Sequence, residues 1–186
     1  MKDERTRICP VELANSLDSK IRRWLQNPKK ILNPYVKEGM KVLDVGCGPG
    51  FFSIELAKMV GKSGKVFSVD LQEGMLQKIS NKIKGTPLEG IINLIKCEQD
   101  KIIVPEKVDF ILAFYMVHEV PNKEILFETL KNTLNEKGEF LIVEPKFFHV
   151  SQKEFDLTIE KAKAVGFKVT KGPKLPFSFS TILKNI

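Results

Sequence analysis

The stretch KVLDVGCGPGFF, residues 41–52, decides the fold. Its first residues form a short apolar run around Asp44, and glycines follow at alternate positions, at Gly46, Gly48 and Gly50. The next residues, FFSIELAKMV, carry apolar side chains at helical spacing. A strand, a glycine-rich turn and a helix in succession are typical of a ligand-binding loop in an α/β sheet. Glycine suits such a turn because a side chain would block the ligand and resist a positive φ.

The glycine spacing separates two kinds of loop. A dinucleotide-binding loop reads G-x-G-x-x-G and rests a pyrophosphate on the helix N-terminus. Here the third glycine comes one residue early, and Phe51 stands where that pattern requires glycine. The run DVGCGPG instead resembles motif I of class I S-adenosylmethionine-dependent methyltransferases. The resemblance implies S-adenosylmethionine as cofactor, S-adenosylhomocysteine as product, and cofactor contacts from Asp44, Gly46, Cys47, Gly48 and Gly50.

A second acidic residue follows at the distance expected for a ribose contact. The run KVFSVD is predicted to be a strand that ends at Asp70, about 20 residues beyond the glycine loop. A carboxylate there can accept two ribose hydroxyl protons. The alternative is that Asp70 only caps the next helix, LQEGMLQKISNKI, and the offset favours ligand contact. The resemblance also implies a residue near the adenine, for which Gln72 and Met75 are candidates, and adds Leu71 and Met75 to the cofactor contacts.

The loop after the third predicted strand, IINLIKCEQD, offers further cofactor contacts. By the resemblance, an acidic residue just past this strand faces the adenine amine. The candidates are Glu98, Gln99 and Asp100. The alternative is a solvated turn.

The fourth predicted strand, in KVDFILAFYMVHEV, is a near-continuous apolar run, as expected of a central parallel strand buried on both faces. Its exit lies beside the first strand, at the switch point where open α/β sheets bind ligands. The resemblance implies that Ala113 and Phe114 border the cofactor and that Tyr115 and His118 are catalytic. His118 could act as a base or be a hydrogen-bonded structural residue.

The rest of the chain completes an α/β pattern. Pro121 and Asn122 are predicted to cap a helix with Ile125, Leu126, Leu130 and Leu134 on its apolar face. GEFLIVEP is the fifth strand, and Ser151 caps the helix QKEFDLTIEKAKAVGF. The link between GFKVTKG and FSFSTILKN is too short for a parallel crossover, so these runs form an antiparallel pair. The prediction is a Rossmann-like doubly wound sheet of seven strands with the last antiparallel, the class I methyltransferase fold.

The length of 186 residues fits one globular domain. Residues 1–38 are predicted to form an N-terminal helical extension. It would comprise a helix over residues 11–26 and a short helix capped by Asn27 and begun by Pro28. Residues 39–186 are predicted to form the S-adenosylmethionine-binding methyltransferase domain. The resemblance implies that the extension covers the cofactor and shapes the substrate pocket.

Composition limits the compartment and the partners. No apolar run approaches the roughly 20 residues that cross a bilayer, and the charged N-terminus lacks a signal peptide, so we expect a cytoplasmic protein. Cys9, Cys47 and Cys97 form no C-x-x-C pair, which predicts neither a disulfide nor a metal site. The net charge of +7 admits an anionic partner. The densest basic patch, residues 20–30 around Trp24, could contact nucleic acid. The preferred interpretation is a solvated amphipathic helix whose Trp24 and Leu25 cover the sheet.

The predicted chemistry is an in-line displacement in a dry pocket, which requires no nucleophile triad and no metal. The HEV exit and the Glu-Pro after the fifth strand resemble small methyltransferases of ubiquinone and menaquinone biosynthesis. AFYMVHEV lacks the N/D-P-P-Y-like motif of base-methylating enzymes, so a small-molecule acceptor is predicted and nucleic acid is not. Two alternatives are an RNA methyltransferase that uses the positive charge, and a non-catalytic cofactor-binding interaction module. A homodimer is left open.

Overall fold

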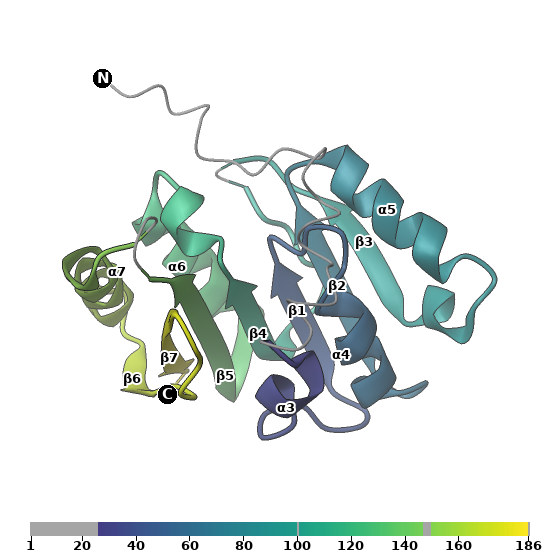
Figure 1. The fold of residues 1–186 in the computed structure, drawn as a ribbon, viewed down its shortest axis with the longest axis horizontal. Helices are drawn as coiled ribbons and strands as arrows, with labels where there is room; N and C mark the ends of the chain where they lie inside the picture. The colour runs from purple at the N-terminus through teal and green to yellow at the C-terminus, as the bar shows by residue number, and fades with distance from the viewer. Residues whose placement is uncertain (1–25, 100, 147–149, 186) are drawn as a thin grey trace.

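A seven-stranded sheet organises the chain (Figure 1). The computed structural model describes residues 26–99, 101–146 and 150–185. The strand order is β3-β2-β1-β4-β5-β7-β6, and the labels run in this order across Figure 1, from β3 at the right to β6 at the left. The strands are β1 Lys41–Val45, β2 Lys65–Asp70, β3 Ile92–Lys96, β4 Val108–Phe114, β5 Leu134–Pro145, β6 Lys168–Lys171 and β7 Ser178–Lys184.

Helices cover both faces of this sheet. The α-helices are α3 Pro28–Leu32, α4 Ser53–Val60, α5 Glu73–Ile83, α6 Lys123–Thr133 and α7 Gln152–Ala164, and the 3-10 turns are η3 Pro87–Gly90 and η4 Val117–Glu119. Helices α3, α4 and α5 pack on one face, and α6 and α7 pack on the other. Neighbouring residues of β1 point to opposite faces, so Val42 joins the first core and Leu43 the second. The predicted doubly wound α/β architecture is confirmed.

The topology matches the class I methyltransferase prediction. Strand β1 pairs in parallel with β2 and with β4, and β4 pairs in parallel with β5. The last strand, β7, lies between β5 and β6 and is antiparallel to both. Strands β2 and β3 are added on one side of β1, and β4 and β5 on the other, so the strand order reverses between β1 and β4, where Val45 pairs with Ala113. This switch point is the expected place for a ligand.

The predicted helix caps are confirmed by hydrogen bonds to backbone N–H groups. The Asn27 side chain accepts from Lys30 N at 3.1 Å at the start of α3. Asn122 caps α6 in the same way. Ser151 and Glu154 form a capping box at the start of α7. These caps satisfy N–H groups that a helix leaves without an internal partner.

The apolar face predicted for α6 is wrong at two positions. Ile125 is 40% exposed, whereas Phe127 is fully buried. Leu134 lies in β5 instead of α6 and pairs with Val108, ahead of a shift in strand register. Helix α6 therefore ends at Thr133, one residue earlier than the apolar spacing suggested. Leu134 is apolar because it is buried as the first residue of β5, not because it belongs to the helix.

Replacing Ser151 by alanine is expected to lower the free energy of unfolding by about 1 kcal/mol, because the N-cap hydrogen bond to Glu154 N is lost. For a chain of this length that corresponds to a melting temperature about 2–4 °C lower. Thermal unfolding followed by circular dichroism measures it. An unchanged melting temperature would mean that the capping box contributes nothing to stability.

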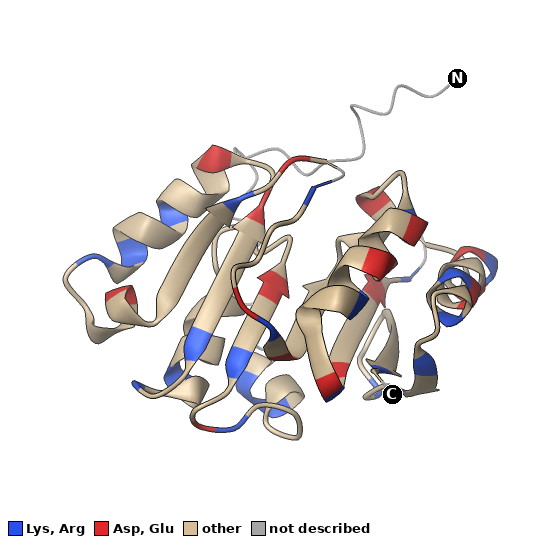
Figure 2. Cartoon of the chain, turned by 180° about the vertical axis from the view of Figure 1, so that it is seen from behind, with Lys and Arg blue, Asp and Glu red and all other residues tan. Residues whose placement is uncertain are grey.

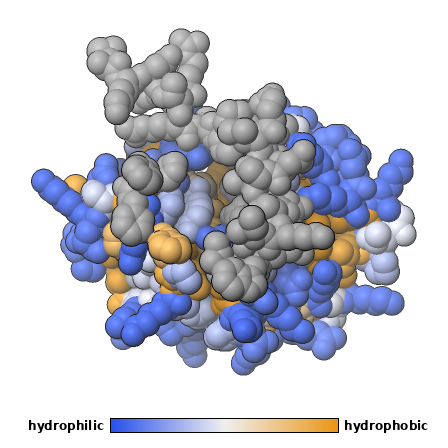
Figure 3. Space-filling view, in the orientation of Figure 1, coloured by the Kyte–Doolittle hydropathy of each residue, from blue (hydrophilic) through white to orange (hydrophobic). Residues whose placement is uncertain are grey.

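Charges of both signs are interspersed over the described residues and do not form one basic stripe (Figure 2). On the face shown in Figure 3, the described surface is mostly hydrophilic, with hydrophobic patches between. Among the residues that the structure describes, no helix is both long enough and apolar enough to span a membrane. The helix predicted over residues 11–26, Cys9 and Trp24 fall outside the described residues, except for Gln26.

Candidate active site

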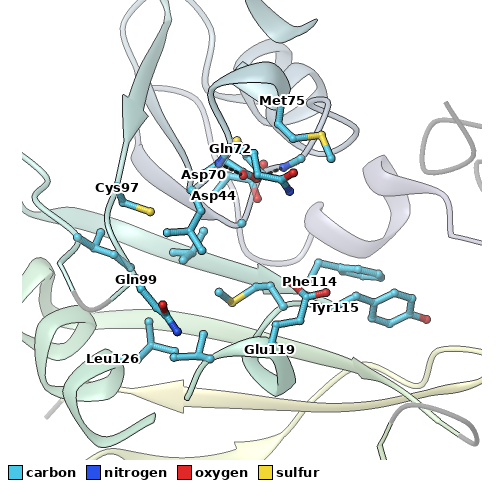
Figure 4. A pocket seen from close by; sticks show the side chains of 18 of the residues that line it. Asp44, Asp70, Gln72, Met75, Cys97, Gln99, Phe114, Tyr115, Glu119 and Leu126 are labelled. Carbon is cyan, nitrogen blue, oxygen red and sulfur yellow. Dashed lines mark hydrogen bonds between the residues drawn. The ribbon is translucent and has the colours of Figure 1, made fainter. Parts of the chain in front are cut away.

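A pocket lies at the carboxyl ends of β1, β2, β3 and β4, at the predicted switch point (Figure 4). The cavity has a volume of about 160 Å³. A single water molecule occupies roughly 10–15 Å³ of such a volume, so the cavity can hold a small organic molecule. Most of the predicted site residues line it: Asp44, Gly46, Cys47, Gly48, Asp70, Leu71, Met75, Glu98, Gln99, Phe114 and Tyr115.

The glycine loop is held against β2 by its backbone. Gly46 N and Cys47 N both donate to Val69 O, at 2.8 and 3.0 Å. Gly46 has a φ of +66°, and a Cβ there would lie 2.8 Å from Met116 Cβ. Gly48 has a φ of +52°, and apart from its chain neighbours no atom of the described residues lies within 4 Å of where its Cβ would stand. Gly46 is therefore required by packing, and Gly48 keeps the pocket side of the loop open.

Asp70 connects the glycine loop to the next helix. Its Oδ2 accepts from Gly48 N and its Oδ1 accepts from Gln72 N, both at 2.9 Å. The carboxylate is 8% exposed. Burial raises its pKa above the usual value, and backbone hydrogen bonds from Gln72, Gly48 and Leu71 oppose that shift. Both interpretations of Asp70 are compatible with this geometry, because the residue holds the start of α5 and also lines the pocket.

Asp44 occupies the buried end of β1. It is 2% exposed, and its Oδ2 accepts a hydrogen bond from Ser53 Oγ at 2.6 Å. Since Ser53 is the first residue of α4, this bond fixes the helix against the glycine loop.

An aromatic wall closes the other side of the pocket. The ring centroids of Phe52 and Phe114 lie 4.4 Å apart, and those of Phe114 and Tyr115 lie 4.6 Å apart. Tyr115 has a φ of 62°, which is uncommon for a residue with a side chain and marks a strained turn. Its hydroxyl lies 2.6 Å from Ser178 Oγ and accepts from Gln26 Nε2 at 2.6 Å. These bonds hold the turn that directs the chain from β4 into η4.

His118 lies behind the pocket wall and does not line the pocket. Its Nδ1 is 2.6 Å from Glu144 Oε2, and Glu144 is 2% exposed. The Glu144 carboxylate also accepts from the backbone N–H groups of Val117 and His118, at 3.0 Å each. Burial lowers the pKa of His118, but the hydrogen bond and charge of Glu144, with Glu119, outweigh burial and leave the pKa raised.

This raised pKa predicts a pH-dependent contribution to stability. The charge on His118 stabilises the fold fully below the unfolded-state pKa of about 6.5, and this stabilisation is lost as the pH rises through the higher folded-state pKa. We therefore expect the stability difference between wild type and His118→Gln to be larger at acid pH than at alkaline pH. Urea unfolding of both proteins between pH 5.5 and 8.5 measures it. A pH-independent difference would contradict the charged pair with Glu144.

Two other predicted residues, Gly50 and Ala113, also do not line the pocket. A Cβ on Gly50 would lie 2.8 Å from Ile79 Cγ1, so Gly50 allows the loop to pack on α5. Ala113 is fully buried among the residues under α6 and α7. Both lie behind the pocket lining.

The sequence analysis missed the wall formed by η4 and the start of α6. The additional lining residues on that side are Met116, Glu119, Val120, Pro121 and Leu126. Figure 4 shows Glu119 beside Phe114 and Tyr115, on the opposite side of the pocket from Asp70. Four of these five residues are apolar, which was visible in the sequence, but the turn at Tyr115 that brings them and Glu119 to the pocket was not.

The charge of the pocket is one-sided. Of the described residues that line it, four are acidic, and none is Lys, Arg or His. The acidic residues are Asp44, Asp70, Glu98 and Glu119. The protein as a whole carries a net charge of +7, so this lining selects locally for a cationic ligand.

The two described cysteines also line the pocket and are free thiols. Burial raises the pKa of Cys47 well above its usual value and that of Cys97 to about 11. Both thiols are therefore protonated near neutral pH. In the part of the chain that the structure describes, no group of three His, Cys, Asp or Glu side chains could hold a metal ion.

A doubly wound sheet with an antiparallel last strand and a glycine-loop pocket defines a class I methyltransferase fold. The sequence comparison agrees, since a family model described as a methyltransferase domain matches residues 36–177. The chain belongs to this methyltransferase family.

Solved and curated proteins show the same relationship. A crystal structure of a SAM-dependent methyltransferase from Aquifex aeolicus is 29% identical, with a TM-score of 0.85, over 96% of this chain and all of that one. Demethylmenaquinone methyltransferase from Bacillus subtilis is 28% identical over 72% of this chain and 58% of its own length. The ubiquinone/menaquinone biosynthesis C-methyltransferase UbiE of Pasteurella multocida is 26% identical over 59% of this chain and 41% of its own length. The chain thus spans about half the length of these curated relatives.

Proposed function

We propose that this protein transfers the methyl group of S-adenosylmethionine to a small-molecule acceptor. The observation that carries the proposal is the acidic pocket at the glycine loop, which contains four carboxylates and no basic side chain among its described lining residues. The methyltransferase family and the Aquifex aeolicus structure support the same cofactor.

The charge of the lining favours this cofactor over a dinucleotide. S-adenosylmethionine carries a sulfonium and an ammonium group, both cationic, which nearby carboxylates stabilise. The phosphates of a dinucleotide would meet the same carboxylates at close range and be repelled. In the proposed complex, Asp70 contacts the ribose, and the backbone of the loop at Gly46 and Gly48 lies along the amino-acid portion.

The protein's own contribution to catalysis is placement and desolvation. When bound, S-adenosylmethionine supplies an activated methyl group with a good leaving group. The apolar wall that includes Phe114, Tyr115 and Leu126 would hold the acceptor in line with that methyl group. The same wall excludes water, which favours a reaction in which the positive charge at sulfur is lost.

The acceptor is proposed to be a compound with a ring of the quinone type in its reduced form. Two relatives are named for demethylmenaquinone and for ubiquinone and menaquinone biosynthesis. The aromatic side of the pocket, where the rings of Phe52, Phe114 and Tyr115 contact one another at tilted angles, suits a flat ring.

We also propose that the N-terminal extension, residues 1–38, caps the pocket through its part before α3, since Gln26 contacts Tyr115 at this wall, whereas α3 and Tyr35 pack at the other end of the sheet (Figure 1). The protein is further proposed to be cytoplasmic and to act without nucleic acid, and a homodimer is one assembly to test.

The test is a transfer assay with methyl-labelled S-adenosylmethionine and three acceptors in parallel: a short-chain demethylmenaquinol, catechol and a structured RNA. We expect label in the small ring compounds and none in the RNA. Label in the RNA alone, with binding that weakens steeply as salt increases, would instead identify an RNA methyltransferase. Tight cofactor binding without transfer to any acceptor would favour a non-catalytic binding module.

A further inference from the structure

Glu119 is the acidic residue on the acceptor side of the pocket. Asp44, Asp70 and Glu98 belong to strand ends or the loops that follow them, on the side of the glycine loop. Glu119 instead ends η4 and lies beside Phe114 and Tyr115 (Figure 4). Its lining neighbours there are the apolar residues Met116, Val120, Pro121 and Leu126. The Glu119 side chain is 23% exposed, and its carboxylate can accept a proton or a hydrogen bond from a ligand group in the pocket.

A histidine and a second carboxylate stand behind Glu119. His118 Nε2 lies 4.0 Å from Glu119 Oε1, and His118 Nδ1 lies 2.6 Å from Glu144 Oε2. Small side-chain rotations or one water molecule would close the longer gap, as is common before a substrate binds. The His118 side chain is 21% exposed, so it can exchange protons with solvent. Among the described residues, the charged groups that act on it are Glu119 on η4, Glu144 on β5 and Lys123 on α6.

We propose that Glu119 binds the hydroxyl group of a phenolic acceptor and accepts its proton during methyl transfer, with His118, held by Glu144, as the positioning residue that passes the proton to solvent. The inference rests on the proposed function and adds to it the residue that binds the acceptor's hydroxyl group and the base that takes its proton. The Phe114 and Tyr115 rings and the neighbouring apolar side chains accommodate the aromatic ring, and the Glu119 carboxylate accepts the hydrogen bond of its acidic hydroxyl. An ammonium group would also be attracted, but it has no electron pair for attack until it is deprotonated.

The reaction balances with these groups alone. The O–H proton moves to the Glu119 carboxylate, an electron pair of the phenolate forms the bond to the methyl carbon, and the S–C bond breaks with its pair returning to sulfur. If the new bond forms at the ring carbon next to the hydroxyl, the hydrogen of that carbon leaves as a proton and the oxygen regains one from Glu119. One proton is released in either case.

The test compares Glu119→Gln with wild type on two acceptors, a hydroquinone and a polyfluorinated phenol that is already ionised at the assay pH. We expect kcat/KM for the hydroquinone to fall by about 100-fold, the scale of a lost general base. The ionised phenol should lose far less, and affinity for S-adenosylmethionine should be unchanged. Glu128→Gln removes the same charge from the exposed face of α6 and should match wild type on both. Equal losses on both acceptors, or none, would overturn the role of Glu119.

His118→Gln tests the relay separately. In wild type, kcat/KM should fall as the pH drops through the pKa of His118, because a protonated imidazole cannot take the proton. In His118→Gln that acid limb should move to lower pH, whereas a structural histidine would leave its position unchanged. Wild type that binds S-adenosylmethionine but methylates no phenol would refute the substrate class. Absence of cofactor binding would refute the proposed function itself.

Discussion

Gly48→Val is expected to abolish binding of S-adenosylmethionine, which we take as at least a 100-fold loss, or about 2.8 kcal/mol. Gly48 has a φ of +52°, a conformation that costs a residue with a side chain about 1–2 kcal/mol and a β-branched one more. The loop would shift to relieve this strain and break the bond from Gly48 N to Asp70. A valine side chain would also enter the space left open for the ligand. Calorimetric titration measures the affinity.

Gly85→Val is the matched control for this substitution. Gly85 has a φ of +71° and, like Gly48, no atom within 4 Å of its would-be Cβ. It lies in the turn after α5 and does not line the pocket. We expect a similar loss of thermal stability in both variants and normal affinity in Gly85→Val alone. Unchanged affinity in Gly48→Val would remove the glycine loop from the cofactor site.

Asp70→Asn is expected to weaken S-adenosylmethionine binding by about 1–3 kcal/mol, or roughly 5- to 150-fold, the scale of losing a charge-assisted hydrogen bond. The substitution keeps the shape of the side chain and removes its charge. The amide can accept from only one of Gly48 N and Gln72 N at full strength, because its NH2 group is a donor. Stability should therefore fall together with affinity, and calorimetry with thermal unfolding separates the two.

Ser151→Ala serves as the control for Asp70→Asn, since it removes a helix cap far along the chain that does not line the pocket. It should lower stability while the affinity for S-adenosylmethionine stays at the wild-type value. If Asp70→Asn changes the affinity by less than a few tenths of a kcal/mol, Asp70 only positions α5 and the loop.

The sequence predicted the sheet well because its signals are local. Each signal limits the local structure to few possibilities. The alternate glycines mark the turn after β1, the acidic residue marks the end of β2, and the short link between β6 and β7 allows only antiparallel pairing. The caps at Asn27, Asn122 and Ser151 were equally readable, because each depends on a side chain and an N–H group three residues away. Leu134 was misplaced because helical spacing and strand pairing both bury a leucine at that point.

The acceptor side of the pocket was harder to predict because it depends on one unusual backbone angle. Tyr115 takes a φ of 62° although it is not glycine, so residue type gave no sign that the chain turns there. That turn puts Glu119 in the pocket wall and His118 behind it. His118 and Glu119 are adjacent in a three-residue 3-10 turn, and no periodic pattern in the sequence indicates which of the two side chains reaches the pocket.

The central claim is that the acidic glycine-loop pocket binds S-adenosylmethionine. Calorimetric titration of the whole chain with S-adenosylmethionine, S-adenosylhomocysteine and NAD, in parallel, tests it most directly. We predict micromolar or tighter binding of the two sulfur compounds and no heat with NAD. Binding of NAD alone, or of none of the three, would contradict the account.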